Sequence, residues 1–354
     1  MDYQNYYLTT YLFSAFVAFL FAINYNIKGR KEVSLNVFLV LVFAFTYALV
    51  FGFRDYSIGS DTQVYVKDFK YNNISEAKDV GFAILIKITS IFTNERGFFV
   101  VVAFLYLSFL SLVFYFFDKT KMYIMFFMFT SMFFFETFGV NVMRNGLASI
   151  LLLLSIMFFL RNKKIIASML LIIASSFHAS IITPFLFWII AKKVRSLKLI
   201  YGIFFATIIL SYLGFGINSI TDVIPMLNIF FKDRFDTYFE NPDWLDYQIG
   251  FKASFVMFNL VFALIGYKLY SNIEDIVKKE KYGRFLRTFL FSSSFFFMSF
   301  YVSFSDRVGA LSWIFIPFLL EPLLDKYRYK YGAIISVLLC FFIFVFFYNT
   351  VRTI

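Results

Sequence analysis

Long apolar segments, separated by short polar or charged stretches, run through the whole chain. An α-helix needs about 17–25 predominantly apolar residues to cross a bilayer, and most of these segments have that length. The pattern therefore predicts membrane-spanning helices at 7–26, 34–53, 97–117, 122–139, 145–160, 199–217, 252–270, 287–304, 308–324 and 331–350.

The segment 165–191 allows two interpretations. It carries polar residues in its middle, ASSFHAS at 174–180, and could form one tilted helix or a re-entrant hairpin with His178 near the turn. The hairpin places most Lys and Arg residues in cytoplasmic loops, as the positive-inside rule requires, whereas a single crossing reverses every later loop. Its arms are too short for full crossings, and such segments are tolerated where they line a wet cavity. We therefore favour the hairpin and a polar cavity that faces outward.

In this topology both termini and two long segments, 54–96 and 218–251, lie outside. The first contains GFAILIKITSIF (81–92), an amphipathic stretch that could lie along the membrane surface. The second is acidic and aromatic. We predict one membrane domain over 1–354, in an all-α, polytopic integral membrane protein with about 11–12 transmembrane or half-membrane helices.

Composition supports this class. Hydrophobic residues make up 61% of the chain and charged residues 16%, against about 45–50% and about 25% in soluble proteins. A single cysteine, Cys340, and a single histidine, His178, exclude internal disulfides and zinc sites that need several such ligands. No glycine-rich nucleotide loop occurs, and we expect no metal and no cofactor. The net charge of +11 is explained by cytoplasmic Lys and Arg beside lipid, and not by nucleic-acid binding.

Ionisable side chains near membrane depth are costly and mark functional sites by default. The noteworthy ones all fall on the outer side of the predicted topology, while the cytoplasmic loops carry plain Lys/Arg clusters. They are Arg54, Asp55, Asp61, Glu136, Arg144, His178, Arg234, Asp306 and Arg307. This one-sided distribution favours an outward-facing site.

Arg144 lies at the start of the predicted helix 145–160. It is either an ordinary interfacial arginine or part of an anion site, in which its fork and the free N–H groups of Asn145 and Gly146 hold a phosphate. Other arginines just outside helix ends could join the same site; they are Arg54, Arg234 and Arg307. Such a set would suit the pyrophosphate of a lipid.

Asp55, Asp61 and His178 are the candidate acid–base groups. Gly59 allows a turn that brings the two carboxylates together. Alternatively, Asp55 pairs with Arg54 or Arg144, and Asp61 caps a helix that begins at Thr62. His178 either accepts a proton from a sugar hydroxyl, or binds that hydroxyl, or is a packed core residue.

Further polar and aromatic side chains could contribute to an outward site. Glu136 is an additional candidate base, unless it reaches to the membrane interface. Aromatic groups that could stack on sugar rings, or belong to an interfacial belt, are Tyr56, Tyr65, Trp244 and Tyr247.

These residues resemble the pattern of EpsG-like proteins, which are Wzy-type polymerases of bacterial exopolysaccharide, capsule and O-antigen. The matching motifs cover most of the chain: Arg54-Asp55 with Gly59, Asp61 and Tyr65; Arg144-Asn145-Gly146-Leu147-Ala148; Phe177-His178-Ala179-Ser180; and Asp306-Arg307 before Pro317. The family often has Glu before the Gly-Phe of the first outer loop. Here the segment reads Asp79-Val80-Gly81-Phe82, and this departure leaves Asp79 without an assigned role.

The resemblance implies a GT-C-like glycosyltransferase in the bacterial inner membrane, with its active site facing the periplasm or cell exterior. It would polymerise undecaprenyl-pyrophosphate-linked oligosaccharide repeat units. Polyprenyl-pyrophosphate-linked glycans, the lipid bilayer, a chain-length regulator and other polysaccharide-assembly proteins are the implied partners. Two other functions remain open from the sequence: a flippase for lipid-linked oligosaccharides, and a membrane O-acyltransferase with His178 as base.

Overall fold

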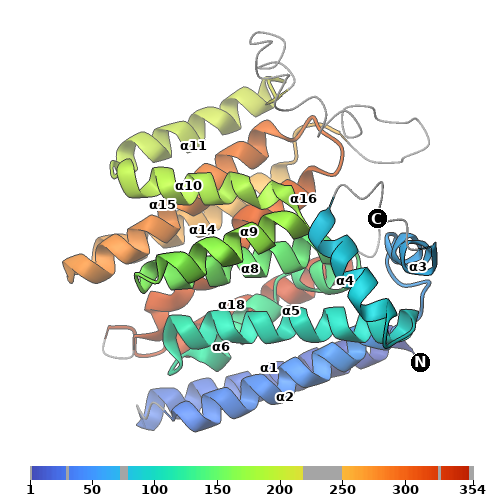
Figure 1. The fold of residues 1–354 in the computed structure, drawn as a ribbon. Helices are drawn as coiled ribbons and strands as arrows, with labels where there is room; N and C mark the ends of the chain where they lie inside the picture. Colours follow the sequence, from blue (N-terminus) through green and yellow to red (C-terminus); the bar gives the residue numbers. More distant parts are fainter. Residues whose placement is uncertain (1, 29–31, 72–78, 218–248, 326–327, 351–354) are drawn as a thin grey trace. The chain divides into compact units, whose positions relative to one another are not determined.

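The computed structural model of the protein describes residues 2–28, 32–71, 79–217, 249–325 and 328–350 (Figure 1). All regular elements within these ranges are helices, which confirms the predicted all-α class. The chain divides into two compact units: unit 1 comprises Met1–Ile182 and Leu323–Ile354, and unit 2 comprises Thr183–Pro322. The single membrane domain expected over 1–354 remains a prediction.

Several segments of the described chain are long and apolar enough to span a membrane. The six that qualify there are Tyr3–Tyr25, Val33–Gly52, Glu95–Asp118, Met143–Leu160, Ala253–Asn272 and Ser305–Leu324. Each begins and ends within a few residues of a predicted span, because the apolar runs stop where polar residues appear. The protein is therefore a multi-pass membrane protein.

Unit 1 is built around long helices that lie side by side. In Figure 1, α2 (Val33–Gly52) packs on α5 (Glu95–Asp118), α5 packs on α8 (Met143–Leu160), and α8 packs on α9 (Lys164–Phe177). The remaining long or central helices of the unit are α1 (Tyr3–Lys28), α6 (Met122–Thr130), α7 (Phe134–Val140) and α18 (Gly332–Thr350). Most side chains of α8 are buried, which makes this helix the centre of the unit.

The span predicted at 122–139 is not continuous. Helices α6 and α7 meet at an angle of 82°. At the bend, the hydroxyl groups of Thr130 and Ser131 donate to the carbonyl oxygen of Phe127, at 3.0 and 2.8 Å. Such back-bonding bends helices, and buried surroundings make the irregular backbone tolerable. Because α6 is apolar and buried on every side, its sequence has no periodicity that reveals the break.

The span predicted at 287–304 is displaced. Helix α15 runs over Ile276–Met298, starting well before the predicted position. Asp275 caps its first turn by accepting a hydrogen bond from the Lys278 N–H at 2.8 Å. The first turns of α15 are rich in charged residues and therefore look like a loop in the sequence, but they are helical and continuous with the apolar part of α15. Farther along α15, the Arg287 guanidinium donates to the carbonyl oxygen of Ala191 at 2.8 Å, near the end of α10 (Ile182–Lys193).

The segment 165–191 is interrupted at its polar centre. Helix α9 ends at Phe177, His178 has an extended backbone, and the short helix η1 (Ala179–Ile181) leads into α10. A continuous tilted helix is thus absent from this described segment. The re-entrant hairpin needs such a break, and it remains a prediction.

A buried asparagine organises the interior of unit 2. Asn259 of α14 (Ala253–Asn272) accepts hydrogen bonds at its side-chain oxygen from the Ser293 hydroxyl at 2.8 Å, the Ser312 hydroxyl at 3.4 Å and the Trp313 indole N–H at 3.3 Å. These donors belong to α15 and α16 (Ser305–Trp313). In a membrane, where water does not compete, such a polar hub fixes the register of three helices.

Two adjacent serines of α15 allow a matched test of this hub. Ser293→Ala removes a hydrogen bond to Asn259 and should lower stability by about 0.6 kcal/mol, up to roughly 2 kcal/mol. Ser292 is equally buried, and its hydroxyl has no partner within the described part of the chain, so Ser292→Ala should leave stability unchanged. Thermal unfolding of the detergent-solubilised variants measures both, and equal losses would contradict the role of Asn259.

Candidate functional site

A loop and two short helices cover one end of unit 1. We call this region the cap and define it as residues 53–71 and 79–92; it contains α3 (Thr62–Tyr71) and α4 (Val80–Ser90). Helix α3 packs on α4 and α5, and α4 packs on α5 and α9, as Figure 1 shows. Gly59 turns the loop with a φ of +90°, and α3 begins at Thr62 as the sequence predicts.

Arg54 belongs to the first turn of the cap, directly after α2, and is only 2% exposed. Its guanidinium donates to the carbonyl oxygens of Phe51 at 2.6 Å and Val140 at 2.9 Å, and lies 4.4 Å from the centroid of the Phe99 ring. Burial lowers the pKa of Arg54 to about 10, so the group is still charged at neutral pH. This placement gives Arg54 a structural role, and substrate binding by Arg54 remains a prediction.

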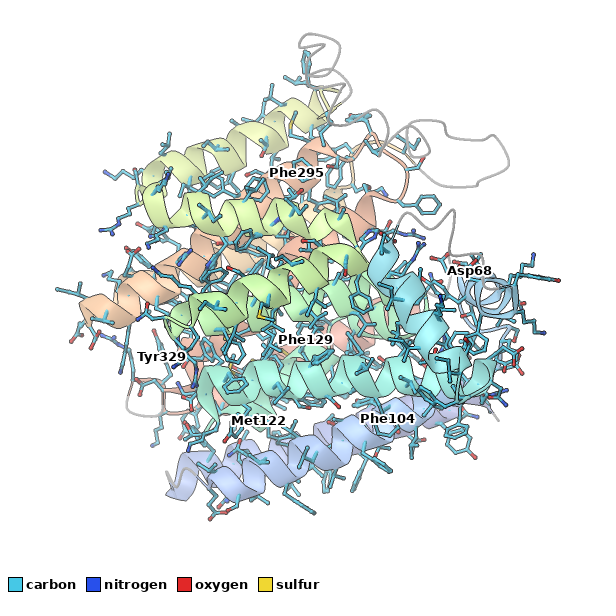
Figure 2. The ribbon with its side chains drawn as sticks, viewed as in Figure 1. Asp68, Phe104, Met122, Phe129, Phe295 and Tyr329 are labelled. Atoms are coloured by element: carbon cyan, nitrogen blue, oxygen red, sulfur yellow. The ribbon has the colours of Figure 1, made fainter. Side chains whose placement is uncertain are left out.

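One face of α3 and the turn before it carries polar groups toward Arg144. Asp61, Tyr65 and Asp68 recur at helical spacing, and both carboxylates interact electrostatically with Arg144. The guanidinium carbon of Arg144 is 5.8 Å from the centroid of the buried Tyr65 ring. Burial raises the pKa of Asp68, which is labelled in Figure 2, and so makes its carboxylate a stronger base than an exposed aspartate.

Close packing of α4 on α9 brings two chain segments together. A Cβ atom at Gly81 would lie 2.9 Å from the backbone carbonyl carbon of Ser176, so only glycine permits this approach. The Phe82 ring, next in the chain, contacts the Phe177 ring with a centroid distance of 6.5 Å. The residues at the adjoining helix ends, Asp79 before α4 and His178 after α9, are therefore neighbours.

Asp79, Arg144, His178 and Tyr65 form the centre of the candidate site, and we call them the Asp79 cluster. Oδ2 of Asp79 accepts a hydrogen bond from a terminal guanidinium nitrogen of Arg144 at 2.9 Å and lies 3.3 Å from Nδ1 of His178. The side chain of Asp79 is 12% exposed, whereas those of Arg144 and His178 are 37% and 29% exposed. Both basic groups therefore retain surface that a ligand can reach, while the carboxylate between them is largely covered.

The backbone at the start of α8 differs from the one expected for the predicted anion site. The backbone N–H of Gly146 donates to the carbonyl oxygen of Val142 at 3.0 Å, so the prediction of a free N–H at this position is wrong. Asn145 is buried, and its side-chain oxygen accepts a hydrogen bond from the Ser149 hydroxyl at 3.2 Å. The helix begins at Met143, earlier than expected, and this shift uses the Gly146 N–H within the first turn.

The two aspartates of the loop occupy different environments. Asp55 is exposed, and hydrogen bonds from the N–H and hydroxyl of Ser57, at 2.9 and 2.8 Å, lower its pKa. The backbone N–H of Asp61 donates to the side-chain oxygen of Asn141 at 2.8 Å, which fixes Asp61 beside the start of α8. Of the two, Asp61 is placed near the Asp79 cluster. Elsewhere in unit 1, the carboxylate of Glu136 accepts a hydrogen bond from the Tyr3 hydroxyl at 2.9 Å.

Unit 2 carries a further candidate arginine. The guanidinium carbon of Arg307 lies 4.7 Å from the centroid of the Phe304 ring, and Phe304 has a left-handed backbone with φ of +56°. Nearby, Nζ of Lys252 donates to the Ser305 hydroxyl at 3.3 Å, and burial lowers the pKa of Lys252. Arg234 lies outside the described residues. A shared site for the two arginines and Arg144 remains a prediction.

Two acidic residues of the site were not assigned from the sequence. The segment around Asp79 departs from the family pattern, and Asp68 lies outside the motifs that the sequence shows. Asp68 follows Asp61 by two helical turns, so helical spacing could have identified it. Among the residues that the structure describes, no group of three or more His, Cys, Asp or Glu side chains could hold a metal ion.

Arg54 and Arg144 can be distinguished by their effects on folding. Arg54→Ala leaves the buried carbonyl oxygens of Phe51 and Val140 without this donor and should cost about 1–3 kcal/mol of stability. Arg144→Ala removes a partly exposed ion pair and should cost less than about 1 kcal/mol. Thermal unfolding in detergent measures both losses. An Arg54→Ala protein of wild-type stability that has lost its activity would instead assign Arg54 to substrate binding.

Comparison with known proteins gives one match. The sequence model of the EpsG family matches residues 36–354, which is most of the chain and includes the whole cap, α8 and His178. No curated protein and no solved structure matches the chain. The extent of the match shows that the chain belongs to the EpsG family, a family of Wzy-type polysaccharide polymerases.

Proposed function

We propose that the protein is a glycosyltransferase that polymerises undecaprenyl-pyrophosphate-linked oligosaccharide repeat units at the outer face of the bacterial inner membrane. Membership of the EpsG family indicates a polysaccharide polymerase of exopolysaccharide synthesis. The lipid-linked donor, the side of the membrane and the residues involved are the parts that we propose.

The Asp79 cluster is the observation that carries the proposal. A partly exposed guanidinium lies at the start of a membrane helix, with a histidine and several carboxylates close to it. A guanidinium has five N–H donors, and the contact with Asp79 involves one terminal nitrogen. Arg144 also hydrogen-bonds the side chain of Tyr65. Its remaining donors suit the oxygens of a pyrophosphate, for which the planar fork of arginine is well shaped.

The reaction needs one bond to break and one to form. The bond between the anomeric carbon and the pyrophosphate oxygen breaks, and its electron pair remains on the pyrophosphate. Arg144 stabilises the negative charge that develops there. A hydroxyl of the acceptor glycan forms the new glycosidic bond, and its proton passes to a base in the protein. The sugar on the lipid supplies the activated group, so no nucleotide sugar is required.

Exposure, contacts and pKa shifts support an order among the candidate bases in this proposal. His178 is partly exposed, adjoins Asp79, and has a second ring nitrogen that can accept a proton. Asp61 and Asp68 lie near Arg144, and the raised pKa of Asp68 favours proton uptake. Asp55 is the weakest candidate, because the hydrogen bonds from Ser57 lower its pKa and stabilise its unprotonated form.

A reconstituted assay tests the function directly. The purified protein is incubated with its polyprenyl-pyrophosphate-linked repeat units, without nucleotide sugar, and the products are separated on a gel. A ladder of chain lengths supports the polymerase. With a verified cognate repeat unit, transfer of glycan across vesicles without chain growth would point to a flippase, and modification that depends on acyl-CoA would point to an acyltransferase.

Substitution of Arg144 tests the proposed contact with pyrophosphate. Arg144→Ala should lower polymer formation by about 10²–10³-fold, because it removes charge stabilisation from the leaving group. Arg144→Lys should recover part of the activity, since it keeps the charge but loses the fork. Gel laddering with equal amounts of folded protein gives the comparison. Wild-type chain growth in Arg144→Ala would exclude the proposed role.

A further inference from the structure

Asp79 is the point at which the cluster converges, yet the reaction described above does not use it. Its Oδ2 atom lies 2.9 Å from a guanidinium nitrogen of Arg144 and 3.3 Å from Nδ1 of His178. A carboxylate that faces a guanidinium acts as a hydrogen-bond acceptor. The hydrogen of the contact with His178 must then belong to Nδ1.

The location of this hydrogen decides what the other ring nitrogen can do. In a neutral imidazole one nitrogen carries the hydrogen and the other is an acceptor. When Nδ1–H donates to Asp79, Nε2 is left with a free electron pair that can receive a proton. An isolated histidine side chain prefers the opposite tautomer, in which Nε2 carries the hydrogen and therefore cannot itself accept the proton of a sugar hydroxyl.

The backbone around the pair is well suited to fix this geometry. Gly81 and Ser176 hold α4 and α9 in backbone contact two residues away from Asp79 and His178, respectively. The backbone N–H of His178 donates to the carbonyl oxygen of Ala174 at 3.1 Å, so the residue remains tied to the end of α9. The two side chains therefore meet because their helices are packed together.

We propose that Asp79 is a positioning residue that holds His178 in the Nδ1–H tautomer and thereby prepares Nε2 to accept the proton of the acceptor hydroxyl. This inference rests on the proposed glycosyl transfer for its catalytic meaning. The tautomer itself is a property of the resting protein. It can be measured without substrate.

The single histidine of the chain makes the measurement direct. Full-length protein with ¹⁵N-labelled histidine, purified through a histidine-free affinity tag, gives nitrogen signals from His178 alone. In the wild-type protein, the neutral imidazole should show a protonated Nδ1 and an unprotonated Nε2. Asp79→Asn should shift the majority to the Nε2–H tautomer, and Asp79→Glu should preserve the wild-type form.

Asp68→Asn is the matched control. It removes a carboxylate that also interacts with Arg144 but leaves Asp79 in place, so the tautomer of His178 should remain as in the wild-type protein. A change of the same size in Asp68→Asn would assign the effect to the general loss of negative charge and would overturn the specific role of Asp79.

Kinetics provide the second readout. In the ladder assay, Asp79→Asn should reduce the turnover number by about 10²-fold, the effect expected when a base is poorly oriented. Asp79→Glu should recover most of the turnover number.

The proposed glycosyl transfer and the proposed role of Asp79 can fail independently of each other. Absence of polymer with a cognate substrate overturns the proposed function. An Nε2–H tautomer in the wild-type protein, or an unchanged spectrum in Asp79→Asn, overturns the role of Asp79 even where polymer forms.

Discussion

Arg54 carries a positive charge at the end of a membrane helix, and its side chain is almost fully buried. An isolated charge in such a place is strongly unfavourable unless nearby acceptors stabilise it, and acceptors meet both terminal nitrogens of Arg54. The carbonyl oxygens that it uses, those of Phe51 and Val140, belong to the ends of α2 and α7. This requirement ties the loop of the cap to the turn that precedes α8. The position of Arg144 at the start of α8, and hence of the Asp79 cluster, depends on that connection.

The positions of the membrane helices follow closely from the sequence, because the transfer of polar groups into lipid is costly and sets their ends. Where a predicted helix differs from the structure, the difference is local. At the bend between α6 and α7, the hydroxyl groups of Thr130 and Ser131 bond to the carbonyl oxygen of Phe127, and a uniformly buried helix shows no periodic signal for such a bend. The early start of α15 lies in charged turns, where hydropathy cannot distinguish a polar helix from a loop.

The candidate site was accessible from the sequence only in part. Arg144 and His178 belong to motifs that could be recognised, and the structure places them in one cluster. Arg54 and Arg144 look equivalent in sequence, since both adjoin helix ends; their difference in burial depends on tertiary packing. The position of Asp79 beside His178 depends on a contact between Gly81 and Ser176, which are far apart in the chain. A pattern of residue types along the sequence contains no information about that contact.

The carboxylate that Arg144 and His178 share also suggests an order of events in the proposed mechanism, in which the donor substrate binds before the base is fully oriented. In the resting protein, Arg144 and His178 both meet the same oxygen atom of Asp79. In this mechanism, a pyrophosphate bound to the other donors of Arg144 would draw the guanidinium toward itself and weaken its contact with Asp79, because two anions would then share one cation. If Arg144 moved toward the pyrophosphate, His178 would remain in contact with Asp79, and the distance from Nδ1 to Oδ2 could shorten from the resting 3.3 Å. Binding of the donor substrate would thus improve the orientation of the base that activates the acceptor.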